Sequence, residues 1–448
     1  MKTLATLAAL AILLSLASAG RAAEPLPPIQ KVQLGPGGAY MVNGKPLVVL
    51  GLWLQTPGDF ALLKENGFNV IAGYWWDKKK TTPEEAAKGI LEYAEQVHKA
   101  GMYFIAPYEV EMEDAMKKLA ATDYLLGWTH DDEPDMPRKV DPNIDKNVPA
   151  GVKYLPRQSA AEAVAKYQRL RKVDPMRPVE VGFTASFMAS DPKFTPEQKK
   201  QIYSEFMKAG DAGGFDTYPI FGSATPGKLL NVGQGVAELR ALIGPDRGLL
   251  CAIETNKGSK WVTPAKQLDV KPEHTRFETW SALLHGATGI AYFTHKWKDP
   301  DGKDNYQTFA PKDDPAMLAE LKRLNEQIAR LAGAILAPPA KVKVEMKLAG
   351  PSGGLAFYFK ATSLDGAVYV FAQNQDLGKD PRDFKQFEAI TPRSGKAAFT
   401  IAGLKAGTKI EVVDEGRTIT AEEGKFSDDF KPLAEHVYKI AWPKLQGG

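Results

Sequence analysis

Eight short apolar runs, each followed by a helical pattern, organise the chain from residue 47 to about residue 336. The runs are continuous rather than alternating, as expected of strands in a parallel sheet that is covered on both faces. Eight such repeats favour a closed (β/α)8 barrel, a TIM barrel of the α/β class, over an open doubly wound sheet. The runs are LVVLGLWL (47–54), FNVIAGYWW (68–76), MYFIAPY (102–108), YLLGWTHDDE (124–133), PVEVGFT (178–184), GGFDTYPI (213–220), GLLCAIET (248–255) and GIAYFTH (289–295).

The helical patterns carry their own start and stop signals. Thr82-Pro83-Glu84-Glu85 is typical of a capping box with proline at the first helical position, and Ser159-Ala160-Ala161-Glu162 repeats the box. In the last helix, leucine and isoleucine recur at spacings of three, four and seven from Leu318 to Ile335. Pro338-Pro339 then ends the helix, which places the barrel domain at residues 24–338.

Beyond the prolines the apolar period changes from helical to two. Runs such as AVYVFA, AAFTIA and HVYKI are separated by turns rich in glycine and aspartate, which predicts a small antiparallel β-sandwich over residues 339–448. Before the first barrel strand, AYMVNGKP predicts a short hairpin turned at Asn43-Gly44, covering the bottom or side of the barrel.

The first 19 residues have the pattern of a secretory signal peptide. Lys2 precedes an uncharged run from Leu4 to Ala17, and Ala17-Ser18-Ala19 is a small-residue cleavage site. The run is shorter than the roughly 20 residues that a membrane-spanning helix needs. We therefore expect a secreted or periplasmic protein without a membrane anchor. Its single cysteine, Cys251, allows no disulfide within the chain.

Charge and motif content exclude several classes of partner. The formal net charge is only +3, with acids and bases interspersed, which gives no basic patch for nucleic acid or a membrane surface. Neither a phosphate-binding loop nor a dinucleotide fingerprint is present, so no cofactor is expected.

Acidic residues stand at the carboxyl ends of two of the predicted strands, where barrels of this kind carry their functional residues. Asp131, Asp132 and Glu133 follow the fourth strand, and Glu254 ends the seventh. A lone acid at a strand end is more often a helix cap or a surface charge. Strands four and seven, however, lie across the ring from each other, and two facing carboxylates are what glycosidic bond hydrolysis requires.

Several segments resemble clan A glycoside hydrolases, the group that contains the β-galactosidase-like and cellulase-like barrels. They are NGKPLVVLGLWL, LLKENGFNVI, LLGWTHDDEP, FDTYPI and HGATGIAYF. The resemblance implies a retaining enzyme for an oligosaccharide or polysaccharide, with β-linked sugars expected. It also implies that Glu133 is the acid/base, that Glu254 is the nucleophile and that Tyr218 touches the nucleophile.

The chain departs from that family pattern at two places. Asp132 stands where the clan usually has asparagine, and Tyr74-Trp75-Trp76 ends strand two, where arginine is common. Asp132 could bind a sugar hydroxyl as asparagine would. As an anion beside Glu133 it should also raise the pKa of that carboxyl, which suits a general acid.

Aromatic residues gather at the same strand ends. Trp53, Trp75, Trp76, Trp261 and Trp297, with His295, are candidates for substrate contact because sugar rings stack on aromatic faces. Tryptophan also fills barrel tops as ordinary packing, which remains the alternative reading for each of them.

Two other functions fit parts of the same pattern. A barrel without activity could bind glycans through these aromatics. His130 and the three acids after it could also belong to a metal-dependent hydrolase. Neighbouring residues on an extended strand point to opposite faces, however, so they cannot easily share one ion, and no metal is predicted. Long polar loops over 135–157, 256–271 and 296–314 are expected to shape the substrate cleft.

Overall fold

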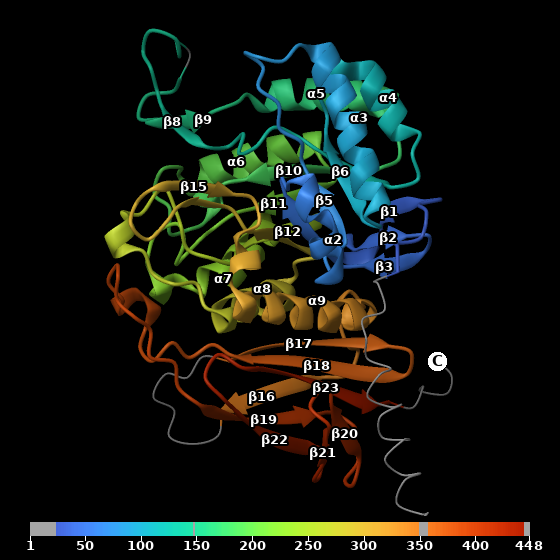
Figure 1. The fold of residues 1–448 in the computed structure, drawn as a ribbon. Coiled ribbons are helices and arrows are strands. Elements are labelled where there is room, and N and C mark those ends of the chain that lie inside the picture. The colour runs from blue at the N-terminus through green and yellow to red at the C-terminus, as the bar shows by residue number, and fades with distance from the viewer. Residues whose placement is uncertain (1–23, 147, 349–356, 443–448) are drawn as a thin grey trace, which may run out of the picture.

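The computed structural model describes residues 24–146, 148–348 and 357–442, and the predicted signal peptide lies outside them. Eight parallel strands form a closed barrel (Figure 1). All eight predicted barrel strands are confirmed, each shorter than its apolar run. They are β4 (Val49–Trp53), β5 (Val70–Ala72), β6 (Tyr103–Pro107), β7 (Leu125–Thr129), β10 (Val179–Phe183), β11 (Ala212–Phe215), β12 (Gly248–Glu254) and β13 (Gly289–Phe293).

Helices follow the strands and surround the barrel. In the described residues none of them is long and apolar enough to cross a membrane. The capping box at Thr82 is confirmed, since Glu85 N donates to Thr82 Oγ1 at 3.2 Å and Thr82 N donates to Glu85 Oε2 at 2.9 Å. The box predicted at Ser159 is wrong, because that side chain makes no capping bond. The helices are α2 (Phe60–Glu65), α3 (Pro83–Lys99), α4 (Glu113–Ala120), α5 (Ala160–Val173), α6 (Pro196–Phe206), α7 (Asn231–Ile243), α8 (Pro272–His285) and α9 (Pro315–Ile335).

A three-stranded antiparallel sheet closes the bottom of the barrel. It is made by β1 (Val32–Leu34), β2 (Tyr40–Val42) and β3 (Lys45–Leu47). The predicted Asn43-Gly44 turn is confirmed, with positive φ values of 51° and 80° that fit a type I′ hairpin. Side chains of β1 and β2 pack with inward-facing residues of the barrel strands. The N-terminal end of the barrel is therefore filled, and the open end is the carboxyl end of the strands.

The C-terminal residues form two antiparallel sheets around a separate core, as the sequence predicted. Two strands, β21 and β22, were not among the predicted runs because polar residues interrupt them. One sheet holds β16 (Val344–Leu348), β19 (Gly395–Ile401) and β22 (Lys425–Phe430). The other holds β17 (Phe357–Leu364), β18 (Ala367–Asn374), β23 (Glu435–Ala441), β20 (Lys409–Val412) and β21 (Arg417–Thr420).

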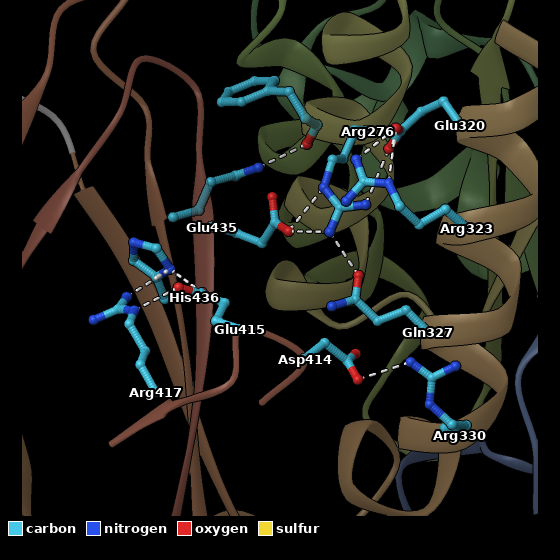
Figure 2. A network of polar contacts seen from close by, with 12 residues as sticks. Arg276, Glu320, Arg323, Gln327, Arg330, Asp414, Glu415, Arg417, Glu435 and His436 are labelled. Atoms are coloured by element: carbon cyan, nitrogen blue, oxygen red, sulfur yellow. Dashed lines mark hydrogen bonds and ion pairs between the residues drawn. The ribbon is translucent and has the colours of Figure 1, made fainter. Parts of the chain in front are cut away.

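The five-stranded sheet packs on α8 and α9 of the barrel (Figure 1). Trp280 of α8 lies 6.1 Å from Phe371 of β18 between ring centroids. Beside this apolar contact, Arg276 joins the two domains through Glu435 of β23 and Glu320 of α9 (Figure 2). All three side chains are at most 14% exposed. The sandwich is thus fixed to the side of the barrel.

We expect Arg276→Met to destabilise the protein by about 3–5 kcal/mol, because it leaves a buried carboxylate without its partner. The matched control is Arg323→Met. Arg323 binds the same Glu320 but is 63% exposed, and an exposed pair contributes about 0–1 kcal/mol. Urea unfolding of both variants measures the difference, and equal losses would show that the buried network does not join the domains.

Candidate active site

A cavity of about 430 Å³ opens at the carboxyl ends of the barrel strands. Its volume lies within the range of about 300–1,000 Å³ that is usual for small-molecule sites. Two kinds of side chain share its wall. The carboxyl groups belong to Asp132, Glu133, Glu180 and Asp216, and the aromatic rings include Trp53, Tyr218, Trp261, Phe293 and Trp297.

Glu133 reaches the cavity from the loop after β7. Its backbone has a φ of 47°, in the left-handed region that non-glycine residues rarely adopt. Asp135 holds this conformation from two residues away. It is fully buried and accepts hydrogen bonds from the Tyr203 hydroxyl at 2.6 Å and from Thr184 N and Oγ1 at 2.8 Å. Backbone strain that is held in place by buried hydrogen bonds is typical of functional residues.

The surroundings of Glu133 favour its protonated form. Burial raises the pKa of this carboxyl to about 7, and repulsion from Asp132 and Asp135 adds to the shift while Arg157 opposes it. The predicted effect of Asp132 is therefore confirmed in direction, although burial is the larger cause. A carboxyl group with a pKa near 7 can deliver a proton at neutral pH.

Asp131 and His130, which precede Glu133 in the sequence, do not line the cavity. Asp131 pairs with Lys166 at 2.9 Å, and the buried His130 places Nε2 2.7 Å from the Ala209 carbonyl oxygen. Within the described residues, no three His, Cys, Asp or Glu side chains are arranged to hold a metal ion.

Glu254, the predicted nucleophile, does not line the cavity. Its side chain is fully buried, and its two carboxyl oxygens accept hydrogen bonds from Ile220 N at 2.8 Å and Phe221 N at 2.6 Å. Glu278 of α8 lies beside it, and burial raises the pKa of both carboxyl groups. The structure therefore does not bring Glu133 and Glu254 into one cavity. In this conformation Glu254 holds the segment that carries Tyr218.

Asp216, which the sequence analysis did not single out, lines the same cavity as Glu133. Its N–H donates to the Phe183 carbonyl oxygen at 3.2 Å, and the Glu133 N–H donates to that of Gly182 at 3.1 Å. The two acids therefore flank the end of β10, about two strand spacings of roughly 4.8 Å apart along the ring. Burial, with repulsion from Glu133, raises the pKa of Asp216 well above its usual range.

Glu180 forms the acidic floor of the cavity. Val179, Val181 and Phe183 of the same strand pack outward against the helices, so strand alternation turns Glu180 inward. Gly214 on β11 leaves room for it, because a Cβ there would overlap the carboxyl group. Burial raises the pKa of Glu180 to about 7. In the sequence, Glu180 can be recognised as the single acid within the apolar run PVEVGFT.

The raised pKa of Glu180 makes stability depend on pH. The folded state binds this proton more tightly than the unfolded state, whose pKa is near 4.5. The proton on Glu180 therefore stabilises the folded state fully below pH 4.5, and this stabilisation is lost as the pH rises through about 7. We expect Glu180→Gln to exceed the parent protein in stability at pH 8, by at most about 3 kcal/mol, but not at pH 4. Denaturant titrations at both pH values test this; an unchanged difference would contradict it.

Aromatic rings form one side of the cavity as predicted. Tyr218 and Trp261 lie 8° from parallel with their centroids 6.2 Å apart, and Trp297 lies 5.5 Å from Trp261. Phe293 packs under Tyr218 at 4.7 Å, and Lys260 lies 4.6 Å above the Trp297 ring. These rings form an aromatic rim of the kind that sugar rings stack on.

Three predicted contact residues lie outside the cavity wall. Trp75 is 70% exposed on the surface, and Trp76 packs under Lys78 at 5.2 Å. His295 is buried behind the wall, where it stacks on Trp53 at 5.7 Å and its Nε2 lies 2.9 Å from the Trp53 carbonyl oxygen. The strand β5 ends at Ala72, before Trp75 and Trp76. These two tryptophans therefore lie in the loop after the strand and do not line the cavity.

No protein-family model and no curated protein matches the sequence. Solved structures do match the fold. A glycoside hydrolase shares 13% identity over 92% of this chain and 97% of its own, with a TM-score of 0.54. An α-amylase from Geobacillus thermoleovorans, complexed with acarbose, shares 11% over 88% and 97%, with a TM-score of 0.51. A family 5 glycoside hydrolase from Bacteroides vulgatus shares 12% over 92% and 93%, with a TM-score of 0.50. The chain therefore has the barrel fold that these glycoside hydrolases share.

Proposed function

We propose that this protein hydrolyses a glycosidic bond in the cavity at the barrel mouth. The observation that carries the proposal is one cavity in which Glu133, with its pKa near 7, faces further carboxyl groups beneath a rim of aromatic rings. Glycoside hydrolysis requires a proton donor and a second carboxylate on either side of the sugar. The glycoside hydrolases of similar fold support the same reaction class.

Glu133 and Asp216 are the proposed pair. Burial and mutual repulsion raise the pKa of both carboxyl groups, so a proton held between them belongs to the pair. Glu133 gives that proton to the leaving oxygen as the bond to the anomeric carbon breaks, and the Asp216 carboxylate bonds to that carbon. Glu133 then takes a proton from water, whose oxygen displaces Asp216 and leaves the sugar hydrolysed with its configuration retained.

Glu254 remains the alternative nucleophile, on the strength of the family resemblance. It would first have to release the two backbone N–H groups of Ile220 and Phe221 that now hold it. A β-linked substrate is likewise proposed from the resemblance, and the α-amylase of similar fold makes both anomers necessary in any test. The predicted signal peptide puts the proposed site of action outside the cytoplasm.

A panel of aryl glycosides in both anomeric forms tests the proposal, with Asp216→Asn as the negative control. We expect turnover of at least one glycoside by the parent protein and almost none by the variant. Dialysis against a chelator should leave the rate unchanged, since the reaction needs two carboxyl groups only. A rate lost in chelator and restored by a divalent ion would favour the metal-dependent alternative, and binding without turnover would favour a glycan-binding barrel.

The raised pKa of Glu133 predicts the pH dependence of this activity. The acid must carry its proton, so kcat/KM should fall as the pH rises through about 7. Asp132→Asn removes the neighbouring charge and lowers that pKa, which should move the falling limb to lower pH. Asp131→Asn, at an acid paired with Lys166 outside the cavity, is the control. A limb that stays in place would assign the titration to another group.

A further inference from the structure

A second groove adjoins the candidate active site. It has a volume of about 670 Å³, and Asp216, Tyr218 and Trp261 line both it and the central cavity. The two spaces therefore meet at these three residues. The groove runs from these residues between the loop after β10 and the start of α7, where Ser190 and Asn231 line it.

The wall of this groove has the chemistry of a carbohydrate site. Hydroxyl, amide and ammonium groups from Ser190, Asn231 and Lys228 are distributed along it, and Tyr154 adds an aromatic ring. At the junction with the central cavity, the nearly parallel Tyr218 and Trp261 rings offer flat apolar faces. Trp261 is 53% exposed although it is a large aromatic side chain. Exposed aromatic faces beside polar groups suit a ligand that presents both C–H faces and hydroxyls.

The charges favour a neutral ligand. Four carboxyl groups line the central cavity, so an anionic chain passing through it would be repelled. In the groove, Lys193 is paired with Asp191 at 3.1 Å, and Lys260 of the cavity and Lys228 of the groove offset the carboxyl groups only in part.

We propose that the groove binds the continuation of a neutral glycan chain whose reacting sugar lies between Glu133 and Asp216. This inference rests on the proposed function, and it adds that the substrate is a chain of at least three sugar units. Each space alone is of a size usual for a small ligand. A single sugar would leave the larger of the two empty, with Tyr218 and Trp261 contacted on one side only.

A printed array of neutral α- and β-linked oligosaccharides, from one to about eight units, tests the proposal with the full chain carrying Glu133→Gln. We expect affinity to rise by more than about tenfold between one unit and three or more. Ser190→Trp, at an exposed lining residue, should fill the groove and remove that gain. Lys228→Trp, also exposed, is a second variant in case the first does not fold. Ser204→Trp, on the exposed face of α6 outside the groove, is the matched control and should keep the gain.

Affinity that does not depend on chain length, equal binding by the groove variants and Ser204→Trp, or no binding of any glycan would overturn the proposal. The outcome is separable from that of the proposed function. If the protein hydrolyses aryl glycosides but binds longer chains no more tightly, only the proposal for the groove is wrong. If the parent protein binds longer chains more tightly but hydrolyses nothing, only the proposed hydrolase activity is wrong.

Discussion

Glu133→Gln is expected to lower kcat/KM by about 10²–10⁴-fold on glycosides with poor leaving groups, the usual contribution of a general acid. Glutamine fills the same space but has no proton to give to the leaving oxygen. The loss should be much smaller for an activated aryl glycoside, whose leaving group departs without protonation. Comparing the two substrates in steady-state kinetics therefore separates proton donation from substrate positioning.

The fold of this variant should be intact, because Asp135 rather than Glu133 makes the buried bonds of the loop. Asp135→Asn is the informative companion. It should disturb the loop and lower the melting temperature, whereas Glu133→Gln should not. An equal loss of activity on good and poor leaving groups would show that Glu133 only positions the sugar.

Asp216→Asn should reduce turnover of every glycoside by at least about 10²–10⁴-fold, whatever the leaving group, because the variant lacks the carboxylate that meets the anomeric carbon. Comparing Asp216→Asn with Glu254→Gln shows which of the two acids is the nucleophile. Glutamine can still accept a hydrogen bond from one of the two N–H groups of Ile220 and Phe221 but not from both in the same way. It should therefore lower stability and have less effect on the chemical step.

Azide can take the place of a missing carboxylate, and the site of rescue identifies the residue. We expect azide to restore activity to Asp216→Asn with formation of a glycosyl azide, and not to Glu254→Gln. Rescue of Glu254→Gln alone would return the nucleophile to the position implied by the family resemblance.

The sequence was sufficient for the fold because the fold follows from short-range signals. Each barrel strand is an apolar run, and the capping box at Thr82 and the turn at Asn43-Gly44 are local patterns that tertiary contacts do not override. The strands β21 and β22 were not predicted because polar residues interrupt their apolar pattern.

The site was only partly predictable, because the direction of a side chain at a strand end depends on its neighbours. Glu133 follows β7 and Glu254 ends β12, yet one faces the cavity and the other turns toward the backbone N–H groups after β11. Glu180 could have been found from strand alternation. Asp216 stands within FDTYPI, two residues before Tyr218, and only the register of β10 and β11 shows that it lies near Glu133.

The most direct test is covalent trapping with a 2-deoxy-2-fluoro glycoside that carries a good leaving group, on the sugar found to be active in the aryl glycoside panel. The fluorine slows release of the glycosyl group, so the modified residue can be located by peptide mass spectrometry. The account predicts one glycosyl group per chain, on Asp216, and no labelling of the Asp216→Asn variant. A label on Glu254, or turnover with inverted configuration and no label, would contradict it.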